Sequence, residues 1–175
     1  MSVIDKVLAA VTPLPDAGRR ADATRRARDV ATSGDWLSLV LDHHDLIRSA
    51  FEDCKAAASA ADRRAAMAAL AEVLNGHALA EELVLYPALA QAGEKVHAGH
   101  AYTEQTTAKM QMAELENIAP STPEWKDKLA HIEGAVLTHM FEEESGWFLT
   151  LKAKSGHDQR LTERYAEEYQ RYVGG

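Results

Sequence analysis

Histidine and glutamate residues recur in this chain at a spacing that suits metal binding. Three histidines are each followed four positions later by a glutamate, and a fourth precedes them: His77 with Glu81, His100 with Glu104, His139 with Glu143, and His44. On an α-helix, an offset of four residues turns about 40° and rises about 6 Å, so both side chains of a pair leave the same face. The pattern therefore indicates metal ligands carried by several helices into one buried site.

The number and type of these side chains narrow the choice of metal. A catalytic zinc ion takes three protein ligands, so seven candidates suit two ions better than one. Imidazole and carboxylate without thiolate favour iron or manganese over calcium and magnesium, which prefer oxygen ligands. Carboxylates can also bridge two ions across a helical bundle. We expect a di-iron centre, with manganese or zinc as ions that could replace iron on purification.

The segments that carry these residues have the apolar period of amphipathic helices, and no strand-like alternation is seen. Gly93 is expected to end the second helix, Pro87 to bend it after Tyr86, and a capping box from Ser121 to Glu124 to open the fourth. The predicted helices span about 35–54, 62–92, 94–118 and 124–154. The chain is therefore predicted to be all-α, with residues 33–155 forming one helical bundle.

Helical phase selects among neighbouring candidates. His44 lies on the apolar stripe of the first helix, and His43 is rotated about 100° toward its flank. Measured from His139, Glu143 is displaced by about 40°, Glu142 by about −60° and Glu144 by about 140°. His43, Glu142 and Glu144 are therefore kept as reserve or outer-shell residues. Tyr86 and Tyr102 could donate hydrogen bonds to the site, but for Tyr86 we favour a role in core packing.

The third helix has an unusually polar predicted inner face. That face comprises Val96, His100, Thr103, Glu104, Thr107, Gln111 and Leu115. A buried, unpaired carboxylate is unfavourable by several kcal/mol, so a bound cation is the simplest explanation. The competing interpretation is a metal-free bundle in which the histidines only pack.

Two segments flank the predicted bundle. Residues 1–32 form a helical appendage, with a short helix after Ser2, a break at 12–15 and an arginine-rich stretch that starts at Asp16. It is either a solvated helix or a docking segment. Residues 156–175 contain an amphipathic helix from about Asp158 to Tyr172 that would cover the bundle or a partner. Two copies of the chain could form a homodimer through either segment.

Composition limits the partners and the compartment. The 175 residues carry a net charge of −8, which argues against nucleic acid or an anionic membrane as the main partner. No apolar run approaches the roughly 18 residues of a membrane span, and the apolar stretch near the start is too short for a secretory signal. Cys54 is the only cysteine, which fits a reducing compartment. We therefore expect a cytoplasmic protein.

The chain resembles the hemerythrin-like, or HHE cation-binding, domains over about residues 35–155. The resemblance rests on four blocks: 42–48 (DHHDLIR), 77–87 (HALAEELVLYP), the helix of His100, and 139–144 (HMFEEE) followed by Trp147 and Phe148. It implies an up-down-up-down four-helix bundle that holds two irons with a bridging oxo or hydroxo species. Glu81 and Glu143 would bridge the irons. Members of the family carry, sense or react with dioxygen, peroxide or nitric oxide, or sense iron.

One departure from the oxygen carriers of that family affects the predicted function. Those carriers have a second histidine where this chain has Glu104, and they place the last carboxylate where Glu144 stands. An anionic oxygen ligand favours ferric iron, so reversible oxygen carriage is disfavoured. We expect a protein that reacts with or senses an oxidant, through a catalase-like, peroxidase-like or oxidase activity. The alternative is a non-enzymatic sensor, carrier or store of oxygen or iron that acts through a partner.

Overall fold

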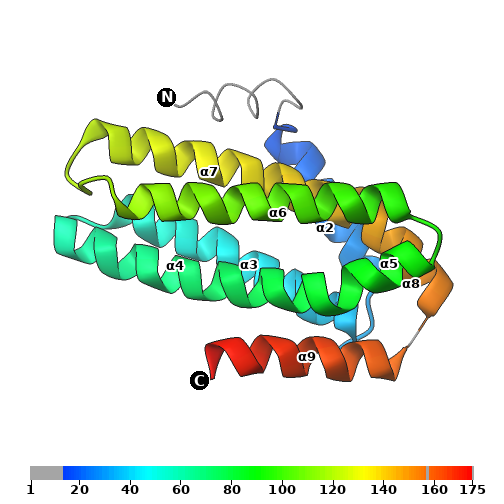
Figure 1. The fold of residues 1–175 in the computed structure, drawn as a ribbon. Helices are drawn as coiled ribbons and strands as arrows, with labels where there is room; N and C mark the ends of the chain where they lie inside the picture. Colours follow the sequence, from blue (N-terminus) through cyan, green and yellow to red (C-terminus); the bar gives the residue numbers. More distant parts are fainter. Residues whose placement is uncertain (1–13, 157, 175) are drawn as a thin grey trace.

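Four long antiparallel helical segments form a bundle in the computed structural model, which describes residues 14–156 and 158–174 (Figure 1). The short helix expected after Ser2 lies outside these residues. The segments are α3 (Trp36–Ala56); α4 (Ala60–Ala80) with η1 (Glu81–Leu85) and α5 (Tyr86–Gln91); α6 (Lys95–Glu116); and α7 (Pro123–Glu142) with η2 (Glu143–Trp147) and α8 (Phe148–Ser155). No strand occurs in the described ranges. The predicted all-α hemerythrin-like bundle is confirmed.

Short polar side chains fix where the helices begin. Asp35 caps α3 by accepting a hydrogen bond from the Ser38 amide at 2.8 Å. Ser59 and Asp62 form a reciprocal capping box, so α4 begins two residues earlier than the sequence pattern indicated. Thr122, rather than the predicted Ser121, caps α7. The residue types predicted the helix starts, but the choice among adjacent polar residues depended on the backbone.

Two π-helical turns interrupt the second and fourth segments. η1 begins at Glu81 and η2 begins at Glu143, so each starts at the glutamate of a His-x-x-x-Glu pair. In η1 the amide of Tyr86 donates a hydrogen bond to the carbonyl of Glu81. Tyr86 is followed by Pro87, which has no amide hydrogen. The irregularity predicted after Tyr86 therefore lies one turn earlier. Such turns often occur at functional sites, because the extra residue redirects the neighbouring side chains.

The apolar core is divided into two clusters by a polar layer. Cluster one includes Leu41, Ala80 and Trp147, and cluster two includes Ile47 and Leu74. His44 thus lies between the clusters on α3, and His77 lies between them on α4. These two candidate ligands are therefore held between two well-packed apolar regions, which restrict their motion.

The third segment turns a different face inward from the one predicted. Val96, assigned to the inner face, is 83% exposed. The buried side of α6 instead comprises Ala98, Ala101, Gln105, Gln111, Met112 and Leu115. Gln111 and Leu115 are buried as predicted, but in the first half of the helix the predicted phase was wrong by about one residue, because the polar residues there give no apolar stripe from which to set it.

Two helices pack outside the bundle. α2 (Ala17–Val30) contacts α3 and η2, and α9 (Gln159–Val173) lies along α4 and α3 (Figure 1). A Cβ atom at Gly76 would lie 2.8 Å from Cγ1 of Val173, so this glycine permits the close approach of α9. Among the described helices, none combines the length and apolarity needed to cross a membrane.

Candidate metal centre

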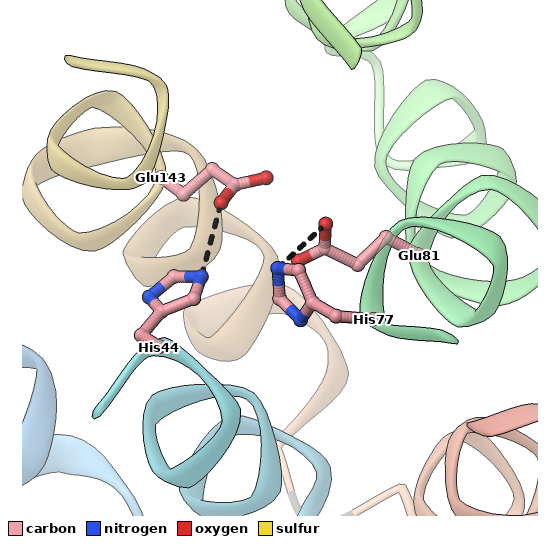
Figure 2. A group of neighbouring side chains, drawn as sticks. All are labelled: His44, His77, Glu81 and Glu143. Atoms are coloured by element: carbon pink, nitrogen blue, oxygen red, sulfur yellow. Dashed lines mark ion pairs between the residues drawn. The ribbon is translucent and has the colours of Figure 1, made fainter. Parts of the chain in front are cut away.

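Four fully or almost fully buried side chains converge at the polar layer. His44 comes from α3, His77 from α4, and Glu81 and Glu143 from the first residues of the two π-helical turns (Figure 2). Each offers one ligand atom, and these atoms all lie within 4.8 Å of one another. Nε2 of His44 is 3.3 Å from Glu143, and Nε2 of His77 is 3.2 Å from Glu81. We call these four residues the buried group.

One atom of each residue in the buried group has no hydrogen-bond partner. These atoms are Nε2 of His44, Nε2 of His77, Oε1 of Glu81 and Oε2 of Glu143. A buried polar atom left unpaired costs roughly 1–3 kcal/mol, and native proteins contain few of them. A single cation would satisfy all four. Two imidazole nitrogens with two carboxylate oxygens fit iron, manganese or zinc better than calcium.

Residues outside the buried group hold both histidine rings in place. Nδ1 of His44 is 2.7 Å from Glu144, which also accepts hydrogen bonds from Arg48 at 2.6 Å and from Thr24 of α2. Nδ1 of His77 lies 3.1 Å from the hydroxyl of Tyr165 on α9. Because Nδ1 is engaged in each ring, Nε2 is free to point into the site, as is usual for metal-binding histidines.

Tyr86 and His139 extend the polar layer beyond the buried group. The Tyr86 hydroxyl lies 3.1 Å from Glu81, 2.9 Å from Glu143 and 3.0 Å from Nε2 of His139. Gln105 of α6 donates through Nε2 to Glu81 at 2.6 Å and also to the Tyr86 hydroxyl. Tyr86 therefore has both roles considered for it, because its ring packs in the first apolar cluster and its hydroxyl bonds to the site.

A second His/Glu group lies at the edge of the bundle. His100, Glu104 and Glu142 bring ligand atoms within 4.8 Å of one another, and we call them the rim group. Nε2 of His100 is 3.5 Å from Glu104 and Nδ1 is 3.6 Å from Glu142, while the His100 side chain remains 43% exposed. Glu104 also accepts from Nδ1 of His139 at 2.7 Å.

The seven predicted ligands are therefore not gathered into one cluster. Four form the buried group, His100 and Glu104 belong to the rim group, and His139 lies between the groups, 3.2 Å from Glu143 and 2.7 Å from Glu104. The expectation of one fully buried site is corrected in this respect. The cause is the orientation of α6, which turns Gln105 rather than His100 or Glu104 toward the core.

The reserve residues take different positions. His43 is buried, lies 2.8 Å from the Tyr165 hydroxyl, and stacks on Tyr169 at 3.7 Å between ring centroids. Glu142 joins the rim group, whereas Glu144 holds the far side of His44. Tyr102 donates to the backbone carbonyl of Glu82 instead of to a ligand.

Opposing electrostatic effects act within the buried group. Burial alone would lower the pKa of His44, but the negative charges of Glu143 and Glu144, one facing each ring nitrogen, outweigh it and raise that pKa to about 9. Burial and the neighbouring His44 charge lower the pKa of His77. Burial and the Glu143 charge raise the pKa of Glu81. A metal would thus displace protons from His44 and Glu81, and its binding would release protons.

Three residues at the site were not found by sequence reasoning. Gln105 was missed because the phase of its helix was misassigned, and Thr24 lies on a segment interpreted only as a solvated or docking helix. Tyr165 was noted as an aromatic residue of a covering helix. Its amphipathic context indicated packing and gave no indication of a histidine partner 88 positions away in sequence.

Comparison with known proteins identifies the family. The profile of the hemerythrin HHE cation-binding domain matches residues 35–151. The chain is also 33% identical over 96 residues to a protein named DNA nickase from Nostoc sp. (strain PCC 7120), covering 55% of this chain and 27% of the nickase. This chain therefore spans only about a quarter of that relative. No solved structure matches the chain. Because the profile covers more than half of the sequence, the chain belongs to the hemerythrin HHE cation-binding domain family.

Proposed function

We propose that this protein binds two iron ions without haem and reacts with or senses an oxidant, namely hydrogen peroxide, dioxygen or nitric oxide. The observation that carries the proposal is the set of four ligand atoms of the buried group without hydrogen-bond partners, which one cation would satisfy, and the rim group offers ligands for a second ion. Family membership supports the same conclusion, because the match is to a cation-binding domain.

The two groups of ligands suggest how the ions would be divided. His44 and His77 would hold an inner ion, and His100, Glu104 and His139 would hold an outer one. Glu81 and Glu143 would serve both, since the Tyr86 hydroxyl contacts these two carboxylates and His139 together. The inner ion would be sequestered by burial. The outer ion would be open to small molecules through the half-exposed rim group.

The chain's own groups would then support chemistry with an oxidant. Bound iron would supply a change of oxidation state and Lewis acidity. The Tyr86 hydroxyl lies where Glu81, Glu143 and His139 meet, so it can donate a hydrogen bond to a ligand that binds there. Gln105 fixes this hydroxyl by donating to its oxygen. Apolar clusters pack on both sides of the buried group, and this low-dielectric environment strengthens the polar interactions there.

Metal content and turnover together test the proposal. Freshly purified protein should contain two irons per chain by elemental analysis and absorb in the near ultraviolet. Iron-loaded protein should decompose hydrogen peroxide much faster than free iron or a Glu104→Ala variant. Less than one metal ion per chain would contradict the proposal and support a metal-free bundle. Predominant manganese or zinc in protein isolated from its native source would contradict the choice of iron.

A sensor that acts through a partner is the second candidate, because helices outside the bundle contact the ligands' neighbours. Thr24 of α2 bonds to Glu144, and Tyr165 of α9 bonds to His77. A change at the metals could thus alter the packing of either helix and, in a dimer formed through them, the interface. Absence of turnover, with a spectrum that reverses when oxygen is removed, would favour the sensor.

The similarity to a DNA nickase does not support DNA cleavage by this chain. The nickase relative shares only 27% of its length with this chain, and a net charge of −8 opposes binding to a polyanion.

A further inference from the structure

A cavity of about 600 Å³ adjoins the candidate metal centre. Its lining includes the small residues Thr107 and Ala108 of α6 and Gly134 of α7, together with Ile47 of α3 and Leu74 of α4. Both groups of the metal centre reach it, because His77, His139, His100 and Glu104 are among the lining residues. The cavity therefore leads from the surface to both proposed ions.

The cavity is much larger than a small oxidant requires. A water molecule occupies about 30 Å³ in the liquid, and peroxide or dioxygen is of comparable size. Pockets for organic ligands typically measure about 300–1,000 Å³ and are mostly apolar with few polar groups. Along α6 the lining runs from His100 to Lys109, a span of ten residues or about 13 Å at the helical rise. The dimensions fit an elongated organic molecule.

One polar side chain at the inner end provides an independent indication of a ligand. Gln105 lines the cavity and is only 6% exposed, and its Nε2 donates to Glu81 and Tyr86. Its Oε1 has no hydrogen-bond partner. This oxygen is covered by protein and a buried acceptor left unpaired is costly, so a ligand that donates a hydrogen bond would be recognised at the end nearest the metals when the amide turns toward the cavity.

We propose that this cavity binds an elongated, mostly apolar organic molecule whose hydroxyl or hydroperoxyl group donates a hydrogen bond to Gln105 beside the metal centre. The inference rests on the proposed function in that it names the class of molecule admitted to the same site. A long-chain alcohol or organic hydroperoxide is then preferred to hydrogen peroxide alone.

The test uses metal-free full-length protein and the unreactive probe 1-decanol, with binding measured by isothermal titration calorimetry. Wild-type protein should bind one decanol per chain, and affinity should rise about fourfold per methylene from hexanol to decanol. Gly134→Leu should weaken binding at least tenfold, because a Cβ at this position meets nothing within 4 Å and the added side chain would fill the cavity. Gly99→Leu is the matched control. It also has open space at Cβ but does not line the cavity, so affinity should change less than twofold.

The outcomes separate this inference from the proposed function. No saturable binding, or equal binding by wild type and Gly134→Leu, would overturn it. Circular dichroism checks that each variant is folded, and Ala108→Leu, on the facing helix, replaces Gly134→Leu if that variant fails. Iron content is measured in parallel. Protein that holds two irons but does not bind decanol contradicts only the cavity proposal, and protein that binds decanol but holds no iron contradicts only the proposed function.

Discussion

The buried group and the rim group contain the same residue types at the same helical spacing but have opposite environments. Glu81 and Glu143 are fully buried and each has an oxygen without a hydrogen-bond partner. His100 is 43% exposed, and its ring nitrogens stay 3.5 and 3.6 Å from carboxylates. Spacing therefore places a histidine and a glutamate on one face, whereas burial determines the cost of leaving that face without a ligand. We infer that the buried group sets metal affinity and that the rim group sets access.

Helix geometry accounts for much of this difference. The π-helical turns at Glu81 and Glu143 redirect both carboxylates into the polar layer, while α6 is regular throughout. In α6 the small residues Ala98 and Ala101 take the inner face and leave His100 at the edge. The rim group is thus a product of how α6 docks.

The comparison is tested most severely by removing one histidine from each group. His77→Ala should abolish binding of both irons, because it removes a ligand of the inner ion and the imidazole that lies beside Glu81, a carboxylate proposed to serve both ions. His100→Ala should retain about one iron per chain, since the buried group remains complete. Elemental analysis after anaerobic loading measures both. Equal losses in the two variants would show that the groups do not differ in affinity.

The stability of the metal-free protein should depend on pH through the buried group. The pKa of His44 is raised from 6.5 to about 9, so its contribution is fully present below pH 6.5 and is lost as pH rises to 9. The free energy of unfolding should fall across this range by on the order of 3 kcal/mol. Urea titrations at several pH values measure it. His44→Gln should flatten the decline and His100→Ala should not, and a flat wild-type profile would contradict the assignment.

Glu104 connects the two groups and should affect only the outer ion. It is a proposed ligand of the outer ion and also accepts a hydrogen bond from Nδ1 of His139 at 2.7 Å; loss of such a hydrogen-bond partner alone typically lowers metal affinity about 10–100-fold. Glu104→Ala should lower the affinity for the second iron by at least that factor and leave the affinity for the first iron unchanged. Stepwise titration with ferrous iron separates the two. A weaker first step would mean that Glu104 supports the inner ion.

Tyr165 tests whether a helix outside the bundle stabilises the buried group. Tyr165→Phe keeps the ring but removes hydrogen bonds to His43 and His77, at 2.8 and 3.1 Å. We expect a loss of about 1 kcal/mol in the free energy of unfolding and about tenfold in affinity for the first iron. Tyr172→Phe, on the same helix and 44% exposed, is the control and should have neither effect.

The smallest effect is expected at Thr24. Thr24→Val removes the hydrogen bond to Glu144 but leaves Arg48 and His44 paired with that carboxylate. The first iron should therefore bind only a few-fold more weakly, with about 0.5 kcal/mol lost in stability. Calorimetric iron titration measures the change. A loss as large as that of His77→Ala would show that α2 is an essential part of the site.

The sequence by itself determined the all-α class, the cation-binding family and the pairing of each histidine with its glutamate. These features depend on local rules, because hydrophobic period and the four-residue offset follow from the geometry of a single helix. Helical phase also selected His44 over His43. In the structure His44 belongs to the buried group, whereas His43 contacts the Tyr165 hydroxyl.

Only the tertiary structure decided which pairs are buried, where the π-helical turns lie, and which distant side chains complete the site. α6 lacks a clear apolar stripe, so its rotation depends on contacts with α5 and α7 rather than on its own sequence. Gln105, Tyr165 and Thr24 reach the polar layer from elements whose relative positions no local rule specifies. Their roles arise from contacts between residues far apart in sequence, and those contacts form only when the helices pack.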